Sequence, residues 1–176
     1  MPTTTPIRLL MVDDHPMLRA GLALVLNSEP GFQVVAEADD GPTALALWRE
    51  RRPDVMLLDL SMSGMDGIET LERLRAEFPD ARVLMLTSSE APEDVRHALA
   101  AGAGGYVTKN VRRAELVMAI RSVYAGGQHV GETVANMIAA RWRSWSWSGR
   151  VSPTSKLAAC WAFRSAPRNS MSRTCW

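Results

Sequence analysis

The sequence predicts an α/β fold in which a doubly wound, five-stranded parallel sheet carries helices on both faces, followed by an irregular C-terminal tail. Short, continuously apolar segments recur along the first 125 residues, and amphipathic segments separate them. Strict alternation of strand and helix favours parallel strands joined by right-handed crossovers. An abrupt change of composition near residue 141 separates the tail from this domain.

Five segments have the composition of strands that are buried on both faces. The first, residues 7–12, is mostly apolar and stops at Asp13-Asp14. The other four lie at residues 32–38, 55–58, 82–86 and 105–107. Continuous apolar runs, as opposed to alternating ones, are typical of parallel strands covered by helices.

The intervening segments repeat apolar residues at helical spacing, which predicts helices with one buried face. Three such faces are Leu18, Leu22, Val25 and Leu26; Ala44, Leu47 and Trp48; and Leu116, Ala119, Ile120 and Val123. Pro16 and Pro42 stand where a first helical turn would begin. Gly31 and the pair Gly126-Gly127 stand where helices would end. The pattern predicts five helices between and after the strands.

Charge divides the chain into two parts. Residues 1–140 contain 13 Lys and Arg and all 19 Asp and Glu, whereas residues 141–176 contain seven basic residues and no acidic one. Five of the six tryptophans and both cysteines, Cys160 and Cys175, also lie in the second part. We therefore assign 1–125 to one domain, 126–141 to a linker with a possible helix over 131–141, and 142–176 to a basic, Trp-rich tail.

The sequence favours a cytoplasmic location. No segment approaches the ~20 consecutive apolar residues that a membrane-spanning helix needs. Residues 1–8 lack the basic flank and long apolar run of a secretory signal. The two cysteines lack metal-ligand spacing, so we expect free thiols in a reducing compartment.

Polar residues follow the predicted strands where ligands bind in doubly wound sheets, at the carboxyl ends. The set comprises Asp13 and Asp14 after the first strand, Asp59 after the third, Thr87 after the fourth, and Thr108-Lys109 after the fifth. Each alone has a common explanation as a helix cap, a β-former or a solvated lysine. Together they place three carboxylates, a hydroxyl and an ammonium at one rim of the sheet.

This combination predicts phosphoryl chemistry. Clustered carboxylates repel one another and favour a bound cation. We expect Mg²⁺ and not zinc, since no His or Cys is expected to converge on this rim. A carboxylate beside Mg²⁺ can attack a phosphoryl group and form an aspartyl phosphate. Lys109 would offset charge on the phosphoryl oxygens, and the Thr87 hydroxyl could donate a hydrogen bond to one of them.

The segments that carry these residues resemble the receiver domain of bacterial two-component response regulators. They are Met11-Val12-Asp13-Asp14-His15-Pro16, Leu57-Leu58-Asp59-Leu60, Gly64-Met65-Asp66-Gly67, Thr87-Ser88 and Gly105-Tyr106-Val107-Thr108-Lys109. The resemblance covers about residues 6–125 and implies a flavodoxin-like (βα)5 receiver fold. The Asp-Asp-His-Pro segment resembles the subfamily that carries a C-terminal LuxR-type helix-turn-helix.

The resemblance implies a phosphoacceptor and a metal site. Asp59 would accept the phosphoryl group from a sensor histidine kinase. Asp14, Asp59 and the backbone carbonyl of Ser61 would bind Mg²⁺ directly, and Asp13 would act largely through water. The protein would promote its own phosphorylation and dephosphorylation without being a dedicated enzyme.

The resemblance also implies a switch. The backbone amides of Leu60 and Ser88 would hold the phosphoryl oxygens, and Thr87 and Lys109 would respond to phosphorylation. Tyr106 would be the switch aromatic that turns inward. The output face would consist of the fourth helix, the fifth strand and the fifth helix, and could support a homodimer. The output would normally be transcription, with DNA as a partner if a helix-turn-helix domain is present.

Two positions depart from the family pattern, which often has proline at both. Ser63 is expected to loosen the loop that supplies Ser61. Asn110 leaves open whether the peptide bond after Lys109 is cis, because a non-prolyl cis bond costs ~2.5–4 kcal/mol. We assign His15 to a turn before a helix, His97 to a helix and His129 to the linker. None of the three histidines is assigned a catalytic role.

The tail does not fit the DNA-binding domain of the subfamily. Residues 151–156 start like the expected Leu-Ser-Pro-Arg-Glu segment and then diverge. One interpretation is a nucleic-acid or membrane binder, because Arg alternates with Trp. We favour translation out of frame. GC-rich codons for residues 141–148, read in another frame, give Leu-Ala-Glu-Leu-Glu-Leu-Glu, which is a credible helix.

The same fold supports three other functions. A phosphatase with an aspartyl nucleophile would show Asp-x-Asp, but this chain has Asp59-Leu60-Ser61. A flavin- or nucleotide-binding module would need a phosphate-binding loop where Asp13-Asp14 would repel phosphate. A stand-alone adaptor that acts through its fourth and fifth helices remains open.

Overall fold

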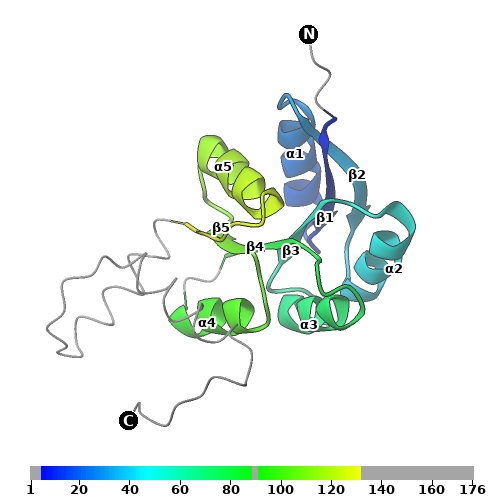
Figure 1. Cartoon of the computed structure of the whole chain (residues 1–176), viewed down its shortest axis with the longest axis vertical. Coiled ribbons are helices and arrows are strands. Elements are labelled where there is room, and N and C mark those ends of the chain that lie inside the picture. The colour runs from blue at the N-terminus through cyan, green and yellow to red at the C-terminus, as the bar shows by residue number, and fades with distance from the viewer. Residues whose placement is uncertain (1–4, 89–90, 132–176) are drawn as a thin grey trace, which may run out of the picture. The chain divides into compact units, whose positions relative to one another are not determined.

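The computed structural model describes residues 5–88 and 91–131, which form a parallel sheet of the order β2-β1-β3-β4-β5-β6 (Figure 1). The strands are β1 Ile7–Val12, β2 Phe32–Ala38, β3 Val55–Asp59, β4 Val83–Thr87, β5 Gly105–Thr108 and β6 His129–Val130. The helices are α1 Pro16–Asn27, α2 Gly41–Arg51, α3 Gly67–Glu77, α4 Pro92–Ala100 and α5 Arg113–Tyr124. The predicted doubly wound receiver fold is confirmed.

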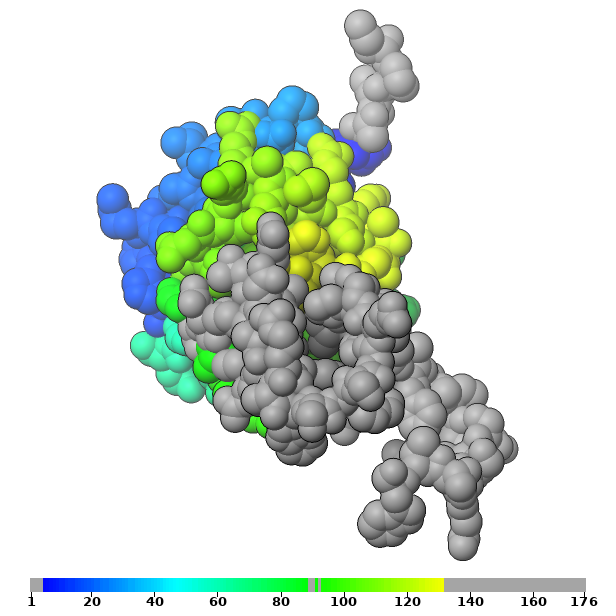
Figure 2. All heavy atoms as spheres, turned by 90° about the vertical axis from the view of Figure 1, so that its left-hand side faces the viewer, coloured from blue at the N-terminus to red at the C-terminus, as the bar shows by residue number. Residues whose placement is uncertain are grey.

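Helices cover both faces of the sheet. Helices α1 and α5 lie on one face and α2, α3 and α4 on the other (Figure 1). Seen from the side, the blue atoms of α1 lie beside the yellow-green atoms of α5 (Figure 2). Every residue of β3 and β4 is buried, which explains why their sequences are continuously apolar. Among the described residues no helix is long and apolar enough to cross a membrane.

Local residues fix where the helices begin. The carboxylate of Asp40 accepts a hydrogen bond from the amide of Thr43 at 2.7 Å and caps α2. Asp66 does the same for α3 through Glu69, at 2.8 Å. Pro16 is the first residue of α1, as predicted. Side-chain caps of this kind satisfy amides that have no partner within the helix.

Glycines occupy the turns that follow α1 and α5. Helix α1 ends at Asn27, before the predicted stop, and Gly31 with φ 89° lies in the turn into β2. Gly126 with φ 80° follows Ala125, the C-cap of α5. Both backbone conformations are left-handed and favour glycine.

The sheet differs from the prediction at one edge, because a sixth strand, β6, pairs with β5. The amide of His129 donates to the carbonyl of Gly104 at 3.1 Å, and the amide of Gly131 donates to that of Tyr106 at 2.9 Å. The assignment of His129 to a linker was therefore wrong. A two-residue strand is too short to show an apolar pattern, and tertiary pairing decides its conformation. The helix expected over 131–141 and the tail 142–176 lie outside the described residues apart from Gly131.

Candidate functional site

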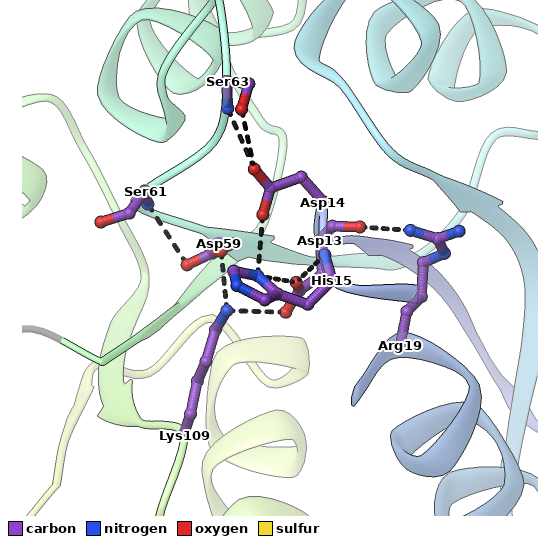
Figure 3. Close-up of polar contacts among 8 residues, drawn as sticks. All are labelled: Asp13, Asp14, His15, Arg19, Asp59, Ser61, Ser63 and Lys109. Carbon is purple, nitrogen blue, oxygen red and sulfur yellow. Dashed lines mark hydrogen bonds and ion pairs between the residues drawn. The ribbon is translucent and has the colours of Figure 1, made fainter. Parts of the chain in front are cut away.

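The carboxyl ends of four neighbouring strands bring the predicted site residues together. Parallel pairing places Val12 beside Leu58, Asp59 beside Leu86, and Thr87 beside Thr108. Asp59 and Thr87 are the last residues of β3 and β4. Because these strands end at nearly the same level, side chains that are far apart in the sequence meet at one rim (Figure 3).

Lys109 joins the carboxylates of β1 and β3. Its Nζ lies 2.7 Å from Asp59 Oδ2 and 2.9 Å from Asp13 Oδ2. The side chain of Lys109 is 8% exposed, and those of Asp13 and Asp59 are 1% exposed. The backbone amide of Lys109 donates to the carbonyl of Thr87 at 2.7 Å, so β4 fixes the start of the loop that carries the ammonium.

Asp14 lies beside this group and is tied to the loop after β3. Ser63 donates to Asp14 Oδ2 from its backbone amide at 3.1 Å and from its hydroxyl at 3.3 Å. The expectation that Ser63 loosens this loop is therefore wrong. A proline at this position could not donate the first of these bonds, because proline has no N–H.

His15 also reaches the acidic group, contrary to the expectation that no histidine converges there. Its Nδ1 lies 2.8 Å from Asp14 Oδ1 and 3.3 Å from Asp13 Oδ1. Its backbone amide donates to Asp13 Oδ1 at 2.8 Å. The expected turn is present, since His15 is the N-cap residue of α1. Sequence spacing predicts the turn, but the direction of the imidazole ring within it depends on the three-dimensional structure.

Burial and charge act in opposite directions on the carboxylates. Burial raises the pKa of Asp59, although the hydrogen bond and charge of Lys109 oppose this shift. Burial also acts to raise the pKa of Asp14, but hydrogen bonds from Ser63 and the charges of His15 and Lys109 hold that pKa below its usual value. The ionisation of the buried Asp59 carboxylate therefore depends on a nearby cation.

The Lys109 ammonium stays charged. Burial acts to lower its pKa, but hydrogen bonds and charges of Asp13 and Asp59 raise the pKa above its ordinary value. Three carboxylates, Asp13, Asp14 and Asp59, face one ammonium, which leaves a formal charge of −2 when all three are ionised. This excess favours a divalent cation at the rim.

Thr87 and Tyr106 lie inside the fold. Both side chains are fully buried, at 0% exposure. The Tyr106 hydroxyl and the Thr87 side chain form a hydrogen bond, and burial raises the pKa of Tyr106. Tyr106 therefore points inward in this structure, and its role as a switch that turns on phosphorylation stays a prediction.

The backbone around Asp59 differs from the expectation at one residue. The amide of Leu60 donates to the carbonyl of Leu86 at 3.1 Å and extends the pairing of β3 with β4. The amide that faces the Asp59 carboxylate is that of Ser61, whose N lies 3.2 Å from Asp59 Oδ1. Ser88, also expected to offer its amide, is exposed directly after β4. The sequence could not distinguish Leu60 from Ser61, because this choice depends on where the sheet pairing ends.

The peptide bond after Lys109 is trans, and the two other histidines lie outside the acidic group. No peptide bond among residues 5–88 and 91–131 is cis, which includes the bond between Lys109 and Asn110. His97 is exposed on α4, as expected for a helical residue. His97 and His129 are not members of the acidic cluster.

The donor set fits a magnesium ion. Ligand atoms of Asp13, Asp14, His15 and Asp59 all lie within 4.8 Å of one another. Carboxylate oxygens are the donors that Mg²⁺ prefers in proteins, together with backbone carbonyls and water. Asp13, Asp14 and Asp59 supply carboxylate oxygens to this group.

Comparisons with known proteins agree with this arrangement. The nitrate/nitrite response regulator protein NarP of Escherichia coli is 41% identical over 141 residues, which are 80% of this chain and just under two thirds, 66%, of NarP. A crystal structure of a LuxR-family two-component response regulator from Aurantimonas sp. SI85-9A1 has a TM-score of 0.75 at 39% identity, covering 78% of this chain and 98% of that one.

A third similarity is to a chain in the CheX-CheY-BeF3-Mg²⁺ complex from Borrelia burgdorferi. The TM-score is 0.65 and the identity 30%, covering 68% of this chain and 90% of that one. The family model described as the response regulator receiver domain matches residues 9–121. The chain therefore belongs to the response regulator receiver domain family of two-component systems.

Proposed function

We propose that this chain accepts a phosphoryl group on Asp59 from a sensor histidine kinase in the cytoplasm. The observation that carries the proposal is the bridge from Lys109 Nζ to Asp59 Oδ2 at 2.7 Å and to Asp13 Oδ2 at 2.9 Å. The bridge keeps a cation beside the carboxylate that would react. An aspartate held in this way can act as a nucleophile while its neighbours offset the charge of the incoming phosphoryl group.

The transfer is an in-line displacement at phosphorus. An oxygen of Asp59 forms a new P–O bond, and the P–N bond to the kinase histidine breaks. The bonding electron pair leaves with the imidazole nitrogen. A proton from solvent then neutralises that nitrogen. Lys109 would move its ammonium onto a phosphoryl oxygen, and the Ser61 amide, 3.2 Å from Asp59 Oδ1, would donate to another.

Mg²⁺ would offset the negative charge of the phosphoryl oxygens when it is bound. Asp14, Asp59 and the Ser61 carbonyl would hold the ion, with Asp13 acting through water. The residual charge of −2 at the rim favours this assignment, as does the presence of Mg²⁺ and BeF3 in the similar Borrelia burgdorferi complex. Ser63 would keep Asp14 in position through its two hydrogen bonds.

The signal would pass from the rim to the face formed by α4, β5 and α5. Thr87 follows the phosphoryl group, and its hydrogen bond with buried Tyr106 connects β4 to β5. A homodimer through this face would include β6, because β6 occupies the edge of β5. Transcription is the proposed output, with DNA as a partner if the intact protein carries a helix-turn-helix domain.

A second candidate is a stand-alone adaptor that binds another protein through the same face. Both candidates require the same phosphorylation, so the chemistry is tested first.

The test is phosphorylation by acetyl phosphate with Mg²⁺, followed by intact mass. We expect wild type to gain the mass of one phosphoryl group, and we expect Asp59→Asn and EDTA-treated wild type to gain none. Asp80→Asn is the matched control, since Asp80 is an exposed aspartate in the turn before β4. Modification that persists in Asp59→Asn, or none in wild type, would contradict the proposal.

A further inference from the structure

We propose that Arg19 is a positioning residue of the acidic rim: its guanidinium holds the backbone of Asp13, and through it the place of the Asp14 carboxylate. The inference rests on the proposed function, because it concerns how this chain presents Asp14 to Mg²⁺. It assigns a role to a side chain of α1 that is not a member of the acidic cluster.

Arg19 connects the end of β1 to α1 and β2. Its Nη1 donates to the backbone carbonyl of Asp13 (Figure 3). Its Nε forms an ion pair with Glu37 Oε2 of β2 at 3.5 Å. The Arg19 side chain is 18% exposed. Because two nitrogens of one rigid, planar guanidinium make these contacts, the contacts fix its orientation.

A cation at this place in α1 opposes the helix dipole. Arg19 is the fourth residue of α1, and its backbone amide donates to the His15 carbonyl at 3.0 Å. The first turn of a helix favours acidic side chains, yet the first turn of α1 contains none. The Asp13 carbonyl and the Glu37 carboxylate offset the unfavourable charge. The guanidinium therefore serves the turn before the helix and not the helix itself.

The contact completes a set of bonds that fixes the backbone of Asp13. The amide of Asp13 donates to the Ala38 carbonyl of β2 at 3.1 Å. Its Oδ1 accepts a hydrogen bond from the His15 amide at 2.8 Å. Arg19 binds the remaining backbone group, the carbonyl. Because the peptide unit is planar, fixing that oxygen also fixes the amide and the Cα of Asp14.

Asp14 is thus held at both ends. Ser63 donates to its Oδ2 from the backbone amide at 3.1 Å and from the hydroxyl at 3.3 Å. Arg19 fixes its Cα through the preceding peptide. Mg²⁺ requires near-octahedral ligands at about 2.0–2.1 Å, so its affinity falls when a ligand is displaced. Losing a group that orients a metal ligand typically lowers affinity about 10–100-fold.

Charge and position predict opposite effects of removing Arg19. By charge alone, loss of a cation near the carboxylates would strengthen the binding of a dication. By position, the Asp13–Asp14 peptide would be free to rotate, and binding would weaken. The sign of the change in Mg²⁺ affinity therefore distinguishes the two.

The test measures the Mg²⁺ dissociation constant by titration calorimetry on the full, metal-free chain. We expect Arg19→Met, which keeps an unbranched apolar side chain, to raise the constant about tenfold. Glu37 is 44% exposed and stays solvated, so the variant should fold. Arg49→Met is the control and should leave the constant unchanged, because Arg49 of α2 forms the same kind of pair with Glu77 of α3, at 2.8 Å.

Two further measurements separate positioning from a general loss of structure. In acetyl phosphate labelling, the Mg²⁺ concentration that gives half the maximal rate should rise in Arg19→Met by the same factor as the dissociation constant. The rate at saturating Mg²⁺ should stay near that of wild type. The amide nitrogen resonance of Asp14 belongs to the peptide group that Arg19 holds, so it should shift in Arg19→Met and not in Arg49→Met.

A dissociation constant that is unchanged or lower in Arg19→Met overturns the proposal. An unshifted Asp14 resonance overturns it too, as does a loss confined to the rate at saturating Mg²⁺. The proposed phosphorylation fails separately. If wild type binds Mg²⁺ in an Arg19-dependent way but gains no phosphoryl mass, only the phosphorylation is overturned. If wild type binds no Mg²⁺, both are overturned.

Discussion

The substitution Lys109→Met removes the ammonium that lies 2.7 Å from Asp59 Oδ2 and 2.9 Å from Asp13 Oδ2. Methionine keeps an unbranched side chain in the same space, so lost charge and not lost packing dominates the effect. We expect a large loss of stability in the metal-free protein. The two carboxylates remain buried and have lost the cation between them.

The magnitude follows from the burial of the three side chains. Asp13 and Asp59 are 1% exposed and Lys109 is 8% exposed, so solvent screens their interaction weakly. Removing one partner of a buried ion pair costs about 3–5 kcal/mol, against about 0.2–1 kcal/mol for an exposed pair. Proton uptake by Asp13 or Asp59, which have lost the ammonium between them, offsets part of this cost. We therefore expect about 3 kcal/mol, the lower end of the buried range.

Urea denaturation followed by circular dichroism measures the change in the free energy of unfolding. Arg73→Met is the matched control. Arg73 pairs with Glu69 at 2.6 Å, but the two side chains are 57% and 48% exposed, so the pair is well screened. We expect this control to lose at most about 0.5 kcal/mol. Mg²⁺ should recover more stability in Lys109→Met than in wild type, because it binds the folded state and replaces the missing charge.

A double-mutant cycle isolates the pair. In the Asp59→Asn background, Lys109→Met should cost at least about 1 kcal/mol less than in wild type, because one buried carboxylate has become neutral. Strict additivity would refute the reasoning. So would a cost of Lys109→Met no larger than that of Arg73→Met, since burial would then not govern this ion pair.

Three further predictions concern the elements around the site. Gly67→Ala should lower the free energy of unfolding, measured by urea denaturation, by about 1–3 kcal/mol, because the new Cβ would lie 2.2 Å from the carbonyl oxygen of Asp59. Gly21→Ala, whose Cβ would meet nothing within 4 Å, should raise it by up to about 1 kcal/mol. Equal effects of the two substitutions would contradict the steric argument. Asp66→Ala should lower the free energy of unfolding by about 1 kcal/mol in the same assay, because it removes the side-chain cap of α3. Asp66→Asn keeps an oxygen that can cap the helix and should cost less, so equal costs would count against capping. Burial lowers the pKa of His129 below 6.5, against the opposing charge of Glu115. The stability that neutral His129 gives β6 is therefore present above pH 6.5 and is lost as the pH falls through the lower folded-state pKa. Exchange of the Gly131 amide, corrected for its intrinsic rate, should accelerate over that range in wild type, and a flat profile would refute the linkage.

The sequence predicted the parts of the fold that depend on local pattern. Continuous apolar runs located β1 to β5 to within one residue at either end, since strands covered on both faces need apolar side chains throughout. The positions of Asp13, Asp59 and Lys109 then followed, because parallel strands end at a common rim. Their mutual distances depend on the order of the strands, which the structure supplies.

The sequence did not predict features that depend on neighbours in space. Strand β6 exists because the edge of β5 offers unpaired backbone groups, and its two residues carry no periodicity. Ser63 was expected to weaken its loop, but the partner that makes it stabilising, Asp14, lies 49 positions away. The contact between His15 and Asp14 was missed for a different reason. The two residues are adjacent, but the direction of the ring is set by the turn before α1.

Strand β5 connects the acidic site to the edge of the sheet where β6 pairs. Lys109 follows β5 and reaches back to Asp59 on β3, so any change of charge at Asp59 acts on the end of β5. Tyr106 lies in the middle of that strand, and its carbonyl accepts the amide of Gly131 after β6. A shift of β5 at Tyr106 must therefore strain or release the pairing with β6. Under the proposed phosphorylation of Asp59, this pairing would carry a movement of β5 to Gly131, the last of the described residues.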